Sequence, residues 1–162
     1  MDPRNPDLAL RPSVIDRLLG AAGPAGPGTD PAGSVAMMKA AVLRDLNWLL
    51  NTRRIYTGAG EGRPELAKSL YTYGLADVTS LARGSTVTAN LLARDLTEAI
   101  RLFEPRLSHV RVTVRTDDDP NSRVLRFLVE AMLDIDPEPM PIAFDTKLEV
   151  GGGSFAVDAE NV

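Results

Sequence analysis

The chain has 162 residues, of which 44% are hydrophobic and 25% charged, and its formal net charge is −4. This composition is typical of a globular domain, and the acidic balance argues against a dedicated nucleic-acid binder. The absence of cysteine excludes disulfides and thiolate chemistry, and a single histidine removes most zinc sites and Ser-His-Asp systems. We therefore expect no cofactor, no metal site and a structural or interaction role.

The start of the chain predicts a cytoplasmic protein. Residues 1–10 contain charged side chains and prolines in place of the apolar stretch of a signal peptide. No segment approaches the roughly 18–20 apolar residues that a membrane-spanning helix needs. We expect no direct membrane insertion.

A short amphipathic helix is predicted within residues 12–19, and a linker follows it. Its apolar side chains recur at helical spacing, and they are Val14, Ile15, Leu18 and Leu19. Residues 20–33 are rich in glycine and proline, as linkers are. We therefore divide the chain into a tethered helix with its linker, 1–33, and a single domain, 34–162. A tethered amphipathic helix either binds a partner or folds back on its own domain, and both interpretations stay open.

Three more helices are predicted before residue 104. The first covers 34–51, with Ser34 as its N-cap and with Arg53 and Arg54 closing its end. The others begin at Pro64, a favoured first helical residue, and near Thr88, and they are expected to cover 64–70 and 88–103.

The remaining segments alternate between apolar and polar residues, which predicts strands. These segments are 110–115, 125–133, 142–150 and 154–157, with a glycine turn at 151–153. The expected fold class is therefore α+β, with N-terminal helices packed on a C-terminal antiparallel sheet that ends in a hairpin. Such a sheet has an open edge, for which 142–150 and 154–158 are candidates. A partner strand can pair there, unless a helix or the terminus covers the edge.

Five segments together resemble one family. They are RPSVIDRLL at 11–19, VLRDLNWLLNTRR at 42–54, SLYTYGL at 69–75, FEPRL at 103–107 and IAFDTKLEV at 142–150. In this combination they resemble TssE, the baseplate wedge family of type VI secretion systems. That family is similar in turn to the small wedge protein of contractile phage tails, the sheath-initiator type.

The resemblance implies a non-catalytic building block of a cytoplasmic baseplate. Members of the family join wedge subunits of the TssF, TssG and TssK kind, and the contractile sheath assembles from that baseplate around an inner tube. Their fold resembles the strand-exchange domain of the sheath subunits. The implied partners are therefore wedge and sheath subunits, with strand exchange as the means by which the first sheath ring is templated.

Glu104, Pro105 and Arg106 are the first candidates for partner binding, because the family associates this motif with wedge assembly. Pro105 holds its neighbours in a rigid corner, and arginine offers a planar fork for carboxylate or carbonyl oxygens. Arg106 binds either a partner or a local acid, and both can hold. Arg53 and Arg54 are either a partner-facing charge pair or a solvated helix end.

Trp48 and Tyr73 have the large amphipathic surface of interface anchors, although we expect each to be buried in the core of its own domain.

Two other functions compete with the baseplate interpretation. A stand-alone cytosolic adaptor would bind one helix or strand of a soluble partner. A lysozyme-like glycoside hydrolase would need two carboxylates about 5–10 Å apart. Glu98 and Glu104 are six residues apart in the sequence, which places them on different faces of a helix. We therefore expect no catalytic residue.

Overall fold

The computed structural model describes residues 15, 18, 31–54, 62–77, 86–115, 124–135, 138–149 and 152–159. The helical elements are α2 (Pro31–Asn51), α3 (Pro64–Ala67), the short 3₁₀ turn η2 (Leu70–Thr72) and α4 (Thr86–Phe103). The strands are β1 (Leu107–Arg115), β2 (Val124–Leu133), β3 (Met140–Glu149) and β4 (Ser154–Ala159). None of the helices in these ranges is long and apolar enough to cross a membrane.

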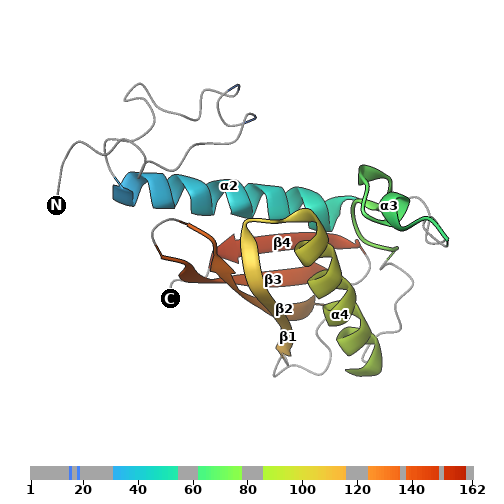
Figure 1. Ribbon diagram of the computed structural model, residues 1–162. Helices are drawn as coiled ribbons and strands as arrows, with labels where there is room; N and C mark the ends of the chain where they lie inside the picture. Colours follow the sequence, from blue (N-terminus) through green and yellow to red (C-terminus); the bar gives the residue numbers. More distant parts are fainter. Residues whose placement is uncertain are drawn as a thin grey trace.

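The four strands form one antiparallel sheet in the order β1-β2-β3-β4. Two long helices lie over one face of this sheet, with α2 alongside β4 and α4 beside β1 (Figure 1). The predicted α+β fold with its C-terminal hairpin is therefore confirmed. The expectation of an open edge at 142–150 is wrong, because β3 has a neighbour on both sides; among the described strands, β1 and β4 form the two edges of the sheet.

The core lies between the helices and the inner face of the sheet. Its largest fully buried side chains come from all these elements, and they include Leu46, Leu49, Leu96, Ile100, Phe127, Phe144 and Leu148. Burying one such side chain stabilises the fold by about 1.5–3 kcal/mol. In α4, Leu92, Leu96 and Ile100 are buried, while Phe103 is half-buried and packs against the core.

Three details differ from the expectations. α2 begins at Pro31 rather than at Ser34, because proline at the first helical position has a preset φ and needs no N–H partner. The helix expected over 64–70 ends at Ala67, and Leu70–Thr72 form a separate 3₁₀ turn. Trp48 is 49% exposed rather than buried in the core.

β1 begins at Leu107, earlier than its alternating pattern indicates. Its register against β2 shifts between Ser108 and Arg111, and His109 has a positive φ of 52°. An irregularity of this kind interrupts the two-residue period of a strand. The alternation becomes regular again only at Val110, which explains why the pattern did not include the start of the strand.

Thr146 of β3 places a hydroxyl group in the core. Its side chain is fully buried, and its oxygen has no hydrogen-bond partner. An unsatisfied buried polar group destabilises a fold by about 1–3 kcal/mol. We expect Thr146→Val to raise the free energy of unfolding by about 1 kcal/mol, because the replacement keeps the shape and removes this penalty.

The matched control for this change is Thr72→Val. Thr72 is also buried, but its hydroxyl donates to the carbonyls of Ala67 at 2.9 Å and Ser69 at 3.0 Å. This second change should therefore lower the stability, by about 1 kcal/mol. Urea unfolding of both variants measures the two effects, and a Thr146→Val protein that is less stable than the wild type would contradict the prediction.

Candidate interaction surface

The corner between α4 and β1 holds a buried carboxylate. Just beyond the end of α4, the Glu104 N–H still donates to the Ile100 carbonyl at 2.8 Å, and the Leu107 N–H donates to the Glu104 carbonyl at 3.1 Å. Pro105 is exposed at the tip of the corner, whereas Glu104 is only 3% exposed. An ionised carboxylate at this depth requires a charged or hydrogen-bonding partner.

Arg106 supplies that partner. Its Nε donates to Oε1 of Glu104 at 2.6 Å, and its Nη2 donates to Oε2 at 2.5 Å. This two-pronged arrangement matches a planar guanidinium to a planar carboxylate. The hydrogen bond to Glu104 raises the pKa of Arg106 above its ordinary value against the opposing effect of burial, so that the guanidinium stays charged. The interpretation of Arg106 as an internal clasp therefore holds in the structure.

α2 extends this pair into a longer chain of charges. Nη2 of Arg106 also donates to Oδ2 of Asp45 at 2.6 Å, and Oδ1 of Asp45 accepts from Nε and Nη2 of Arg44 at 2.9 and 2.8 Å. The Arg44 guanidinium lies 5.0 Å from the ring centroid of Trp48, close enough for a cation–π contact. We call this group the corner cluster, and it comprises Arg44, Asp45, Trp48, Glu104 and Arg106.

The corner cluster becomes more exposed from one end to the other. Glu104 is buried, the side chains of Asp45 and Arg106 are about a quarter exposed at 26% and 24%, and Trp48 is half exposed. Arginine and tryptophan are enriched among the residues that contribute most to binding. The hydrogen bonds that begin at the buried Glu104 therefore hold Arg44 and Trp48 in place at the surface.

Tyr73 lies beside the same charges. Burial raises the pKa of its hydroxyl, and the negative charges of Asp45 and Glu104 raise it further. Its ring contacts Phe103 edge to face, with centroids 5.1 Å apart and planes at 71°. Tyr73 is half-buried and packs against the core, and thus it connects η2 to the end of α4.

Arg53 and Arg54 lie where the chain after α2 pairs with the segment after η2. The Arg54 N–H donates to the Leu75 carbonyl at 2.7 Å, and the Leu75 N–H donates to the Thr52 carbonyl at 2.9 Å. Nη2 of Arg54 donates to the Gly74 carbonyl at 2.9 Å, so this side chain supports the fold. Arg53 is exposed and available at the surface.

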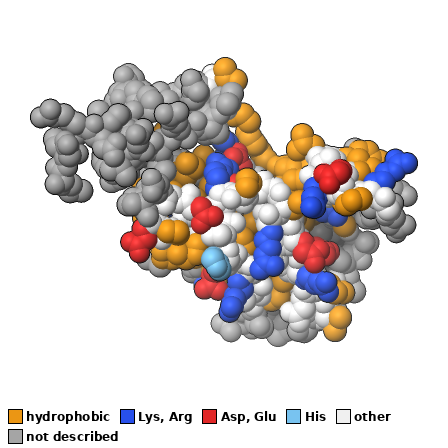
Figure 2. Space-filling view, viewed as in Figure 1, with side chains coloured by type: hydrophobic (Ala, Val, Ile, Leu, Met, Phe, Trp, Pro, Cys, Tyr) orange, Lys and Arg blue, Asp and Glu red, His pale blue; other side chains and the backbone are white. Residues whose placement is uncertain are grey.

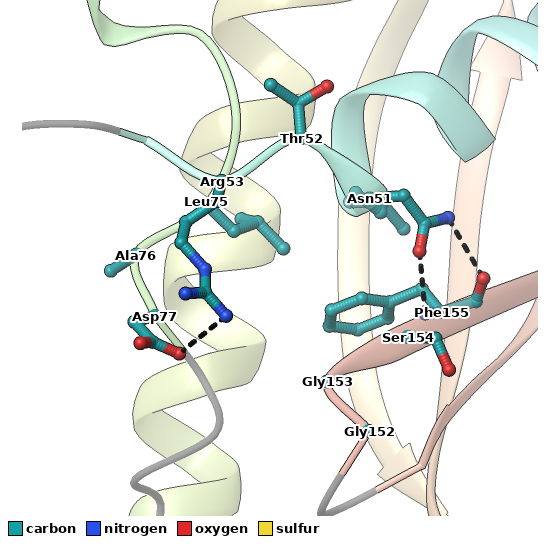
Figure 3. A pocket seen from close by; sticks show the side chains of 11 residues that line it. Asn51, Thr52, Arg53, Leu75, Ala76, Asp77, Gly152, Gly153, Ser154 and Phe155 are labelled. Carbon is teal, nitrogen blue, oxygen red and sulfur yellow. Dashed lines mark hydrogen bonds and ion pairs between the residues drawn. The ribbon is translucent and has the colours of Figure 1, made fainter.

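Arg53 stands at the rim of a pocket of about 290 Å³ (Figure 3). Its Nη2 lies 3.4 Å from a carboxylate oxygen of Asp77, with side chains 64% and 46% exposed. Such an exposed ion pair contributes at most about 1 kcal/mol. On the opposite wall, Asn51 makes two hydrogen bonds with the backbone of Phe155.

A larger groove, of about 620 Å³, separates α4 from the edge strand β1. One wall consists of Val112–Val114, and the other includes Arg94, Thr97 and Glu98 of α4. Arg101, which also lines the groove, donates through Nη2 to the Val110 carbonyl at 2.8 Å. Among the described strands β1 has one neighbour, and an edge strand directs the N–H and C=O of alternate residues away from that neighbour.

The N-terminal candidates are described only at Ile15 and Leu18. Both residues are helical, and their side chains are 48% and 81% exposed. Val14 and Leu19 lie outside the described residues.

Charge does not single out one ligand class on this surface. Acidic and basic side chains are interspersed on the face that carries α4 and β1 (Figure 2). Within the described ranges, no three His, Asp or Glu side chains gather as a metal site would require.

Glu98 is exposed and pairs with Arg94 at 3.2 Å, while both Glu104 oxygens accept from Arg106. A glycosidase general acid must instead hold a proton to donate.

Arg44 and Asp45 were not predicted from the sequence as site residues. The partner of Asp45 is 61 residues away, and no local pattern connects the two. The available signal was Arg44 one helical turn before Trp48, two residue types that are enriched at interfaces.

This chain matches a known protein family and resembles a chain of a solved structure. The model of the family described as baseplate wedge protein gp25 matches residues 36–138, more than half of the chain. No curated protein matches. A solved structure described as the baseplate complex from the type VI secretion system contains a similar chain, with 23% identity and a TM-score of 0.49. The match covers 71% of this chain and 97% of that one.

Proposed function

Because this chain belongs to the family of baseplate wedge protein gp25, we propose that it is a structural subunit of a cytoplasmic type VI secretion baseplate. The motifs that resemble TssE support the type VI system over other contractile machines, and the longest of them, at 42–54, carries Arg44, Asp45 and Trp48. The corner cluster is the observation that carries this proposal, since it joins two of the family motifs through one buried carboxylate.

The corner cluster is proposed as the contact for wedge subunits of the TssF, TssG and TssK kind. Arg106 contributes indirectly. Its guanidinium holds Asp45 in position, and Asp45 in turn holds Arg44 over Trp48. Pro105 and Arg53 stand exposed and are further candidates for direct contact. The exposed side chains of Ile15 and Leu18 suit a tethered helix that docks on a partner.

The groove between α4 and β1 is proposed as the place where a sheath strand adds to the sheet. A strand that enters it would pair with the edge of β1 and lie against α4, in the manner of β-augmentation. Strand addition at this edge would extend the antiparallel order of the sheet by one strand. It would also provide a first template for the sheath ring.

Co-purification of the tagged chain from its native cytosol, with mass spectrometry of the bound proteins, tests the proposal. We expect both wedge and sheath subunits to be recovered. Thr97→Arg, which fills the groove, should reduce recovery of sheath subunits but not of wedge subunits, whereas Leu91→Arg, on the exposed face of α4, serves as the matched control.

Two outcomes of this experiment would count against the proposal. A wild-type chain recovered alone, or with one unrelated soluble partner, would overturn the baseplate function in favour of an adaptor. Full sheath recovery with a folded Thr97→Arg protein would overturn strand addition at β1 and leave the baseplate function standing.

A further inference from the structure

The outer edge of β4 is occupied by side chains of α2. Nδ2 of Asn51 donates to the Phe155 carbonyl at 2.9 Å, and the Phe155 N–H donates to Oδ1 of Asn51 at 2.9 Å (Figure 3). One helical turn earlier, Nδ2 of Asn47 donates to the Val157 carbonyl at 3.5 Å. The primary amide of Asn51 thus makes the reciprocal pair of hydrogen bonds that a residue of another strand would make.

Both amides are held by their own helix. Nδ2 of Asn51 also donates to the Asn47 carbonyl at 2.9 Å, and Nδ2 of Asn47 donates to the Leu43 carbonyl at 3.0 Å. Four residues of helix advance by about 6 Å, close to the roughly 6.7 Å of two strand residues. Consecutive turns of α2 therefore face alternate residues of β4, which are those whose backbone groups point outward.

We propose that Asn51, supported by Asn47, is an edge cap that prevents β4 from pairing with β4 of a second copy of this chain. A free edge strand pairs readily with another chain, and a matching edge is present on every copy. Asn51 occupies both the donor and the acceptor of Phe155, and Asn47 occupies the carbonyl of Val157. This inference rests on the contacts between α2 and β4 alone and is independent of the proposed function.

The self-association of the full chain tests the edge cap. We expect the double variant Asn47→Ala/Asn51→Ala to approach twice the wild-type molar mass as concentration rises, measured by light scattering behind a sizing column. Asn90→Ala makes the same replacement on the exposed side of α4 and should match the wild type. A double variant with wild-type circular dichroism and wild-type mass at every concentration would overturn the proposal.

Hydrogen exchange at Phe155 gives a second test that a poorly folding double variant does not affect. The Phe155 amide should exchange about ten-fold faster in the single variant Asn51→Ala, the expected effect of losing one hydrogen bond. Asn90→Ala, the same replacement away from β4, should leave the exchange rate of the Phe155 amide at the wild-type value. Equal exchange in wild type and Asn51→Ala would show that no edge cap exists.

Discussion

Arg106→Ala is expected to lower the free energy of unfolding by about 3–5 kcal/mol, the usual effect of removing one partner from a buried ion pair. Glu104, which is 3% exposed in the wild type, would lose both of its guanidinium hydrogen bonds. The loss would also remove the hydrogen bond from Arg106 to Asp45. Arg106→Lys keeps the charge but not the fork geometry, so we expect an intermediate loss.

The control for this prediction is Arg94→Ala. Arg94 pairs with Glu98 on the surface of α4, with side chains 76% and 65% exposed. Its removal should change the stability by less than about 1 kcal/mol. Urea unfolding monitored by circular dichroism compares the two variants, and equal losses in both would show that the corner cluster does not stabilise the fold.

Gly74→Ala is expected to lower the free energy of unfolding by about 4 kcal/mol, from a strained backbone and from a steric overlap of about 1–3 kcal/mol each. Gly74 has a φ of +99°, which favours glycine. A Cβ at this position would stand 2.2 Å from the carbonyl oxygen of Thr52 and 2.8 Å from its carbonyl carbon. Neither backbone atom can move without breaking the pairing of Leu75 with the segment after α2.

Gly62 provides a matched control, because its φ is +73° but a methyl group added there would have nothing within 4 Å of it. Gly62→Ala should therefore show only the backbone part of the loss, about 1–3 kcal/mol. The difference between the two variants in thermal unfolding measures the overlap with Thr52. If both variants lose the same stability, the close approach at Gly74 has no energetic effect.

The elements of the fold were largely predictable because each has a local signal. Alternation of apolar and polar residues predicted β2, β3 and β4, and apolar residues at helical spacing are present in α4. Burial of one face of an element produces such a period in the sequence. The start of β1 was missed because the irregularity near His109 removes the period. The motifs also predicted the wedge family, which the family match over 36–138 confirms.

The candidate site was predictable only in part. Glu104 and Arg106 flank the rigid corner at Pro105, and pairing of Arg106 with a local acid was one of the two interpretations that the sequence left open. Their contact with Asp45 spans 61 residues, and no local pattern indicates it. Trp48 was expected in the core, but the Arg44 guanidinium over its ring gives it a favourable place at the surface.

The edge cap covers only part of β4. Four residues of helix and two residues of strand differ in length by about 0.7 Å, so the alignment of α2 with β4 worsens by this amount with each helical turn. The hydrogen bond already lengthens from 2.9 Å at Asn51 to 3.5 Å at Asn47. The next position of that helical row is Leu43, which offers no amide. The cap therefore ends at Val157, whereas β4 continues to Ala159, so the last part of this edge has no side-chain amide of that row beside it.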